Sequence, residues 1–363
     1  MSDVPSAADL IREEIRRHGP LTFARFMELA LYAPGAGYYE RPESTPGRGG
    51  DFFTSVSVGP LFGKLLAWQF VRWLPREGPV QLVECGAHDG RLAADVLDAL
   101  AAHEPAAAAR LRYWIVEPSP ARRAWQERML GAHRAAVCWY DRIEDVPAGA
   151  VRGVIFSNEL LDAFPVHRLR WDADVRGWRE WLVDWAETRF VWRPGPTAGV
   201  ADGLLPDEEL AACLPDGFTR EWCPAAERWW RTAAMALDEG RLATFDYGAE
   251  EEELLLPGHE AGTVRAYLRH RRLDDPLSRP GRCDLTAHVN FTRLRAAGEQ
   301  AGLDTEEYTS QGRFLTGALA RLLRGGGTLA EALMRQARGL QTLTHPGQMG
   351  ASFRVLVQRR GME

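Results

Sequence analysis

The N-terminal part of the chain repeats its apolar positions with the spacing of amphipathic helices. Helices are predicted over residues 6–18 and 21–32, with Thr22 in position to cap the second one. A segment rich in Gly and Pro follows, and then an apolar helix is predicted from about residue 61 to residue 74. We expect these elements to form an N-terminal helical and loop cap, residues 1–79.

From residue 80 onward the pattern changes to short apolar strands that alternate with helices. Strands are predicted over residues 80–85, 113–117, 137–140 and 153–157, and helices over residues 91–102 and 120–130. Strands joined by helices in this way are typical of parallel sheets covered on both faces. The sequence therefore predicts an α/β fold with a doubly wound sheet over residues 80–363.

Two segments interrupt this rhythm and are predicted to be insertions, at about residues 166–225 and 249–290. The first is rich in tryptophan and alternates in short runs, which predicts an antiparallel meander whose tryptophans serve packing. The remaining predicted elements are helix 224–238, strand 241–247, helix 290–301, a helical stretch 312–339 and strand 353–358.

Composition and charge narrow the class of protein. The 363 residues include 45% hydrophobic residues, and no apolar run approaches the length of a membrane-spanning helix, so a soluble globular protein is expected. Residues 1–17 lack the features of a signal or transit peptide, which indicates a cytoplasmic location. The net charge of −6 argues against nucleic acid binding, and the five scattered cysteines argue against disulfides and a metal site.

The segment 82–92 runs from an apolar strand through a glycine-spaced turn into a helix. Gly86 and Gly90 can adopt backbone angles closed to other residues, and the helix start leaves unpaired N–H groups, so a small anionic or nucleotide-like ligand could bind here. This spacing alone is weak evidence. The next strand ends at Glu117, where a carboxylate could bind the two ribose hydroxyls of a nucleoside.

A third group of polar residues follows the strand at 153–157. Asn158 and Glu159 would project from the carboxyl end of this strand toward the ligand bound at Gly86. Asp162 is a second candidate carboxylate. Asn158 and Asp162 have an alternative role as caps of the following helix.

At this point the chain resembles the MidA-like methyltransferases, which use S-adenosylmethionine and include the mitochondrial complex I assembly-factor methyltransferase. The matching motifs, in chain order, are Phe26-Met27, Leu31-Tyr32-Ala33-Pro34, Gly37-Tyr38-Tyr39, Gly50-Asp51-Phe52-Phe53-Thr54-Ser55, Leu61-Phe62-Gly63, the turn from Glu84 to Gly90, Glu117-Pro118-Ser119-Pro120, the run from Asn158 to Val166, Asp246-Tyr247-Gly248 and the run from Asp284 to Phe291. The resemblance implies a Rossmann-like class I methyltransferase sheet with an N-terminal cap and an antiparallel insertion. It also implies that the methyl acceptor is an arginine side chain of a protein, and that this protein is a subunit of a respiratory complex.

The resemblance further implies roles for particular residues. The residues expected to contact S-adenosylmethionine are Glu84, Gly86, Ala87, His88, Gly90, Glu117, Asn158, Gly50, Asp51 and Thr54. Those expected at the methyl-transfer crevice are Glu159, Asn158 and Asp162, and those expected to bind the acceptor are Asp284 and His288. Gly50, Asp51 and Thr54 could instead form a tight structural turn, and Asp284 and His288 could be structural hydrogen-bonding groups.

Departures from the family pattern leave alternatives open. His88 occupies the turn position that is commonly glycine in the family, and it is either a polar contact or a structural residue. Val56-Ser57 replaces the usual Pro-Glu, and Lys64 stands where an acid is common, so an acidic contact is missing. A methyltransferase for a small molecule or a different side chain remains an alternative, as does a non-catalytic assembly or scaffold protein that retains the cofactor fold. A dinucleotide-dependent oxidoreductase is disfavoured because the turn lacks full G-x-G-x-x-G spacing. Oligomeric state, monomer or homodimer, stays open.

Overall fold

The computed structural model describes residues 5–41, 55–197, 213–269, 271–326, 329–330, 333 and 336–361. The chain divides into two compact units. Unit 1 comprises Met1–Phe52, Asp162–Ala226 and Ala249–Asn290, and unit 2 comprises Phe53–Leu161, Glu227–Gly248 and Phe291–Glu363. The expected boundary between a cap and a methyltransferase domain at residue 79 stays a prediction.

Unit 1 begins with the two predicted amphipathic helices. Helix α1 (Ala7–His18) is capped by the side chain of Ser6. Helix α2 (Phe23–Tyr32) begins after Thr22, whose hydroxyl accepts a hydrogen bond from the Arg25 N–H at 3.2 Å. A side-chain oxygen at this position satisfies a backbone N–H that has no partner within the helix. The predicted helices and the predicted Thr22 cap are confirmed.

The tryptophan-rich segment of unit 1 forms the predicted antiparallel meander. Its strands are β6 (His167–Asp172), β7 (Gly177–Ala186), β8 (Arg189–Thr197) and β9 (Thr219–Trp222), and β1 (Leu21–Thr22) pairs with β7. Trp171 and Trp178 are buried and face each other across the β6–β7 pair, with ring centroids 5.5 Å apart in an edge-to-face arrangement. These two tryptophans therefore hold the sheet together through packing.

The second insertion contains a small sheet that the sequence pattern did not predict. Its strands are β11 (Arg265–Leu268), β12 (Arg271–Leu273) and β13 (Asp284–Thr286), with β11 in the centre. The same unit contains the short helices α9 (Glu251–Leu254), η1 (Tyr38–Glu40) and η5 (Leu161–Ala163). Strands of three or four residues give too few alternations to be distinguished from loop sequence.

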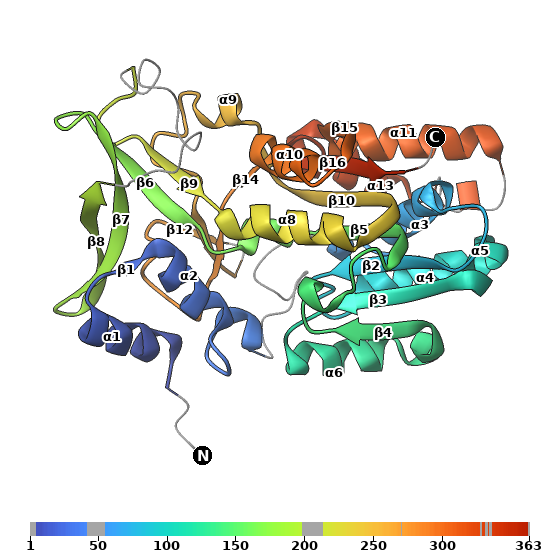
Figure 1. The fold of residues 1–363 in the computed structure, drawn as a ribbon, viewed down its shortest axis with the longest axis horizontal. Coiled ribbons are helices and arrows are strands. Elements are labelled where there is room, and N and C mark those ends of the chain that lie inside the picture. Colours follow the sequence, from blue (N-terminus) through green and yellow to red (C-terminus); the bar gives the residue numbers. More distant parts are fainter. Residues whose placement is uncertain are drawn as a thin grey trace. The chain divides into compact units, whose positions relative to one another are not determined.

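Unit 2 is built on the predicted doubly wound sheet (Figure 1). Along the sheet the strands follow the order β15-β16-β10-β5-β2-β3-β4. Their bounds are β2 (Val80–Cys85), β3 (Leu111–Val116), β4 (Val137–Tyr140), β5 (Val151–Asn158), β10 (Leu237–Ala249), β15 (Asp304–Ser310) and β16 (Phe353–Arg360). The strands from β4 to β10 are mutually parallel, whereas β16 runs antiparallel to both β10 and β15. The strand order reverses between β2 and β5, so the sheet has a topological switch point there.

Helices connect and cover the strands of this sheet. They are α3 (Leu61–Trp73), α4 (Arg91–His103), α5 (Pro105–Arg110), α6 (Pro120–Met129), α8 (Pro224–Ala236), α10 (Phe291–Gln300), α11 (Gln311–Gly325) and α13 (Ala337–Thr344), with short turns η2 (Val56–Val58), η3 (Gly131–Ala136), η4 (Ile143–Asp145) and η6 (Pro346–Gly350). Phe62 of α3 and Phe314 of α11 both pack on Phe245 of β10, with ring centroids 5.6 and 5.3 Å away. The core of unit 2 therefore joins α3, α11 and the sheet.

Near the C-terminus one prediction was wrong and one strand was not predicted. The expected helical stretch 312–339 is interrupted: α11 ends at Gly325, and Gly326 has a φ of 67°, which glycine adopts without steric cost. Strand β15 was missed because its sequence, DTEEYTS, is polar on both faces and it pairs with β16 at the end of the sheet. A strand stabilised mainly by backbone pairing leaves little hydrophobic pattern.

Candidate active site

Three of the predicted ligand segments meet at one edge of the unit 2 sheet. Gly86 follows β2, Glu117 follows β3, and Asn158 ends β5, and β2 pairs in parallel with both neighbours. The Gly86 N–H donates to the Val116 carbonyl at 3.2 Å, which ties the turn to the end of β3. Because parallel strands end at the same edge, these residues lie at the switch point, where open α/β sheets bind ligands.

Both glycines of the turn are required by the backbone. Gly86 has a φ of 76°, and a Cβ there would lie 2.8 Å from Leu160 Cδ1. Gly90 has a φ of 82°, and a Cβ there would lie 3.2 Å from the Cα of Gln126 in α6. Between them the Gly90 N–H donates to the carbonyl of the buried Ala87 at 2.8 Å and closes the turn. The turn is thus held close to β5 and to α6, as only glycine permits.

His88 adopts the same left-handed backbone region as the glycines beside it, with a φ of 47°. Histidine enters this region more readily than most residues with a Cβ, although at some cost. Its ring lies tilted against Trp125, with centroids 6.0 Å apart, and its carbonyl oxygen accepts a hydrogen bond from Gln126. Glycine would adopt this conformation without that cost.

The Glu117 carboxylate is fixed at the end of β3. Its side chain is 1% exposed, and Oε1 accepts a hydrogen bond from the Ser119 N–H at 3.1 Å. Oε2 accepts from the Gln126 amide at 3.2 Å and lies 3.9 Å from an Arg122 nitrogen. These contacts fix the orientation of the carboxylate before any ligand binds, and its expected contact with a ribose stays a prediction.

Glu84 lies within β2 and contacts a neighbouring strand rather than the turn. Its Oε2 accepts a hydrogen bond from the Tyr113 hydroxyl at 2.6 Å, and both residues are buried. Burial raises the pKa of Glu84 to about 8, although the Tyr113 hydrogen bond partly offsets this. The expected contact between Glu84 and a cofactor stays a prediction.

Asn158 and Glu159 occupy the end of β5. Glu159 has a φ of 52° and is half-buried. Its Oε1 accepts hydrogen bonds from the Ser55 N–H at 3.0 Å and from the Asn158 amide at 3.1 Å, and its Oε2 accepts from the Tyr247 hydroxyl at 3.3 Å. Desolvation raises the pKa of Glu159 to about 8, more than these hydrogen bonds lower it. Asn158 therefore supports Glu159 rather than capping a helix.

Asp246 supports this loop from β10, a role that sequence analysis did not assign to it. It is fully buried, and its Oδ2 accepts hydrogen bonds from the N–H groups of Leu160 and Leu161 at 3.2 and 2.8 Å. The Glu159 N–H donates to the Phe245 carbonyl at 2.9 Å. The signal was present, because Asp246-Tyr247 is one of the matched family motifs, but only the structure shows what these residues hold.

The other predicted residues belong to unit 1, where two of them form a cluster with tyrosines. Tyr39 donates to Asp284 Oδ1 at 2.9 Å, and both Asp284 and Asp162 are buried. Burial raises the pKa of Tyr39 well above its usual value, with further contributions from the nearby carboxylates of Asp284 and Asp162. The Ala287 N–H donates to the Asp162 carbonyl at 2.9 Å. Asp162 and Asp284 are thus brought together, while Glu159 and Asn158 lie in unit 2.

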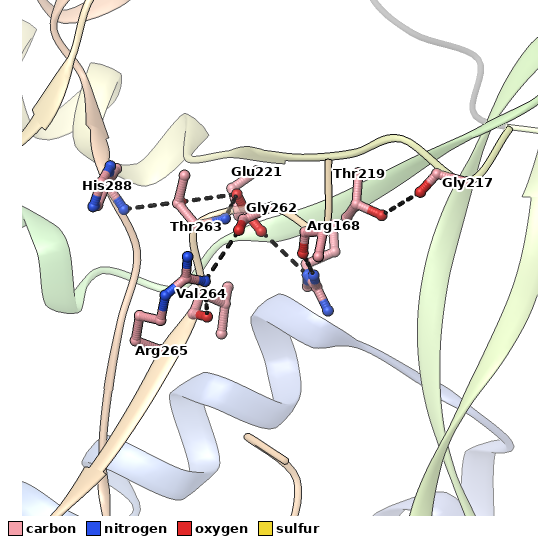
Figure 2. Close-up of polar contacts among 10 residues, drawn as sticks. Arg168, Gly217, Thr219, Glu221, Gly262, Thr263, Val264, Arg265 and His288 are labelled. Atoms are coloured by element: carbon pink, nitrogen blue, oxygen red, sulfur yellow. Dashed lines mark hydrogen bonds and ion pairs between the residues drawn. The ribbon is translucent and has the colours of Figure 1, made fainter. Parts of the chain in front are cut away.

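His288 lies in a separate polar network of unit 1, drawn in Figure 2. Its backbone N–H donates to Thr263 Oγ1 at 3.0 Å, and Thr263 in turn donates to Glu221 through both its N–H and its hydroxyl. Desolvation lowers the pKa of His288 to about 4, and the nearby His259 and Arg265 contribute to the shift. His288 is therefore neutral near pH 7.

Three expected site residues lie outside the described part of the chain: Gly50, Asp51 and Thr54. Among the residues that are described, no group of three or more His, Cys, Asp and Glu side chains could hold a metal ion. Within the same ranges, no helix is both long and apolar enough to cross a membrane.

Comparison with known proteins agrees with this arrangement. Residues 65–309 match a family model described as "Putative S-adenosyl-L-methionine-dependent methyltransferase". The chain is 31% identical to the mitochondrial protein arginine methyltransferase NDUFAF7 homolog of Drosophila melanogaster, over 98% of this chain and 85% of that protein. It is 27% identical to the human mitochondrial protein arginine methyltransferase NDUFAF7, over 94% of this chain and 80% of that protein.

Solved structures give the same result. A protein from Burkholderia thailandensis bound to S-adenosyl-homocysteine is 35% identical, with a TM-score of 0.85 over 98% of this chain and 92% of that one. The chain belongs to the family of S-adenosylmethionine-dependent methyltransferases. The predicted class I methyltransferase sheet, the enzyme class and the cofactor are confirmed. The expected cytoplasmic location is wrong by this comparison, because the fly and human relatives are both named as mitochondrial.

The residues at the switch point fit S-adenosylmethionine. The glycine turn follows β2 and packs against Leu160 and Gln126, and the buried Glu117 carboxylate lies at the end of the adjacent strand. Asn158 Oδ1 is buried and accepts no hydrogen bond from any residue in the described ranges. A buried polar atom without a partner is costly unless a ligand or water completes it. We assign these positions to cofactor binding as a proposal.

Proposed function

We propose that this methyltransferase transfers the methyl group to an arginine side chain of a protein. Support comes from the relatives, several of which are named protein arginine methyltransferases. The observation that carries the proposal is the Glu159 carboxyl, which is held by three hydrogen bonds at the carboxyl end of β5. Its partners fix its position before a substrate binds.

The chemistry supplied by bound S-adenosylmethionine is an electrophilic methyl group on a sulfonium. The work of the protein is to align the acceptor nitrogen with that methyl and to exclude water. Gly86 and Glu117 would hold the cofactor, and the raised pKa of Glu159 means that its carboxyl is largely protonated at pH 7 without substrate. An arriving guanidinium favours the ionised carboxylate, so binding releases that proton.

The ionised Glu159 would then accept N–H hydrogen bonds from the guanidinium and orient it. A charge-assisted pair of this kind draws the positive charge of the guanidinium toward the nitrogens that contact Glu159 and away from the attacking nitrogen. When that nitrogen gains the methyl group it must lose a proton. The Glu159 carboxylate, which contacts the guanidinium, would accept that proton as the methyl–sulfur bond breaks and S-adenosyl-homocysteine is left. Asp162 of unit 1 remains a proposed second catalytic carboxylate, and Asp284 and His288 remain proposed acceptor-binding residues.

The test compares wild type with Glu159→Gln in two assays. Calorimetric titration with S-adenosyl-homocysteine should give dissociation constants within about threefold of each other. Transfer of isotopically labelled methyl groups to a protein extract, read by mass spectrometry, should yield methylarginine with wild type and at least about 100-fold less with the variant, as for loss of a group that both orients and deprotonates. Glu77→Gln, at an exposed position, is the matched control.

Two outcomes would contradict the proposal. Label on lysine, on another side chain or only on a small molecule would reject arginine as the acceptor. Equal losses of cofactor affinity and of methyl transfer in Glu159→Gln would place Glu159 in the cofactor site instead. The respiratory-complex subunit implied by the sequence resemblance stays a prediction, and the identities of the methylated proteins would test it.

A further inference from the structure

A fully buried glutamine lies behind the proposed cofactor site. Gln126 of α6 is 0% exposed, and its amide makes three hydrogen bonds. Nε2 donates to the His88 carbonyl at 2.9 Å and to Glu117 Oε2 at 3.2 Å, while Oε1 accepts from Trp139 Nε1 at 2.8 Å. One side chain therefore contacts the turn after β2 and the carboxylate after β3.

The orientation of this amide is determined by its partners. An indole N–H can only donate, so the atom facing Trp139 must be the amide oxygen. The two N–H groups of Nε2 then point to His88 and Glu117, both of which offer oxygen acceptors. Every donor and acceptor of the amide is used, and a fully satisfied buried network has a single low-energy arrangement.

The backbone at Gln126 also approaches the turn. A Cβ at Gly90 would lie 3.2 Å from the Gln126 Cα and 3.4 Å from its Cβ. Helix α6 is thus in van der Waals reach of the second glycine, while its glutamine holds the peptide of His88 two residues earlier. This helix residue therefore links the turn to the Glu117 carboxylate, in addition to the backbone hydrogen bond from Gly86 to Val116.

We propose that Gln126 is a positioning residue for cofactor binding. It sets the distance between the glycine turn and the Glu117 carboxylate, so that both can contact one cofactor molecule. Groups that orient a contacting residue through hydrogen bonds commonly affect affinity without touching the ligand. The inference rests on the proposed assignment of Glu117 to the cofactor ribose.

The chain contains a matched control for this glutamine. Gln358 of β16 is also 0% exposed, and its Oε1 accepts from an indole, Trp230 Nε1, at 2.7 Å. Its Nε2 donates to the Arg295 carbonyl and to Thr305 Oγ1, both at 2.9 Å. Strand β16 is separated from β2 by β10 and β5 in the sheet. The two glutamines share burial and hydrogen-bond pattern but not location.

The experiment uses the full-length variants Gln126→Met and Gln358→Met. Thermal unfolding without ligand should show a loss of stability in both, because each substitution removes three hydrogen bonds of a buried amide. Calorimetric titration with S-adenosyl-homocysteine should show affinity about tenfold weaker for Gln126→Met, as expected for loss of a hydrogen bond to a charged group. Affinity for Gln358→Met should stay within twofold of wild type. Equal weakening in both variants, or wild-type affinity in Gln126→Met, would overturn the proposal.

A third variant separates this inference from the assignment on which it rests. Glu117→Gln should weaken binding strongly, and adding Gln126→Met to it should cause less than the product of the two separate losses, because both act through one carboxylate. If Glu117→Gln binds normally, the ribose assignment fails. If Glu117→Gln binds S-adenosyl-homocysteine weakly and Gln126→Met binds it with wild-type affinity, only the role of Gln126 fails. If Gln126→Met does not fold, Trp139→Phe is the alternative variant, because it removes only the hydrogen bond to the Gln126 amide oxygen. It should weaken S-adenosyl-homocysteine binding about threefold. Unchanged affinity would refute the positioning role of Gln126.

Discussion

Without ligand, the variant Glu84→Gln should gain stability over wild type, and this difference in the free energy of unfolding should increase as the pH rises. The Glu84 side chain is buried in β2 and accepts a hydrogen bond from the Tyr113 hydroxyl at 2.6 Å. Burial raises the pKa of this carboxyl from 4.5 to about 8. Between these two values the unfolded chain releases a proton that the folded protein keeps, so the free energy of unfolding falls as the pH rises.

The size of the effect follows from the two pKa values. At pH 5 the ionisation of Glu84 favours unfolding by about 1 kcal/mol, and at pH 8 by about 4 kcal/mol. Glutamine cannot ionise, yet its amide oxygen can accept the same Tyr113 hydrogen bond. The stability difference between Glu84→Gln and wild type should therefore grow by about 3 kcal/mol over this interval. For 363 residues this corresponds to about 4 °C in melting temperature.

Thermal unfolding of both proteins at pH 5, 6, 7 and 8, without ligand, measures this difference. All other titrating groups are common to the two proteins and cancel. Tyr113→Phe is the companion variant: the Tyr113 hydrogen bond lowers the Glu84 pKa, so its removal should make the loss of stability with pH steeper. A stability difference that stays constant from pH 5 to pH 8 would show that Glu84 ionises in the folded protein as it does in the unfolded chain, and the reasoning would be refuted.

Two further predictions concern the turn and the unit 1 network. Gly86→Ala should lower the free energy of unfolding by about 1–3 kcal/mol, because a φ of 76° is strained for alanine and the new Cβ would lie 2.8 Å from Leu160. It should also weaken the binding of S-adenosyl-homocysteine measured by calorimetry. Unchanged affinity would place the turn away from the cofactor. The His288 ring should remain neutral down to about pH 5, because its pKa is lowered to about 4, and carbon-detected NMR titration of the ring would contradict this with a midpoint near 6.5.

Much of the fold could be predicted because its signals are local. Strand β2 and helix α3 occupy the predicted ranges to within a residue, since an apolar run and an amphipathic period are visible in any short window. The sheet of β11, β12 and β13 could not be predicted, because its strands are short and β13 pairs with β11 across a long loop. Strand β15 was missed because its neighbour β16, rather than its own side chains, holds it in place.

The candidate site shows the same division. Gly86, Glu117 and Glu159 were identifiable because each follows a predicted strand, and parallel strands end at one edge. The residues that support them were not identifiable. Asp246 and Gln126 act through hydrogen bonds to segments about 86 and 38 residues away, and no sequence spacing records such contacts. The sequence therefore predicted the residues that are proposed to contact the ligand, but not the residues that hold these in place.

Backbone strain gives an independent reason to place the chemistry at the ends of β2 and β5. In the described part of the chain, five residues other than glycine have a positive φ: His88, Glu159, Arg176, Glu187 and Arg269. The last three lie in the turns between β6 and β7, β7 and β8, and β11 and β12, where the geometry of tight hairpins demands that conformation. No hairpin accounts for His88 and Glu159. Each costs on the order of 1 kcal/mol or more and persists only because surrounding contacts impose it. His88 and Glu159 both follow adjacent parallel strands at the switch point. The two strained residues that no hairpin explains therefore lie at the site proposed for methyl transfer.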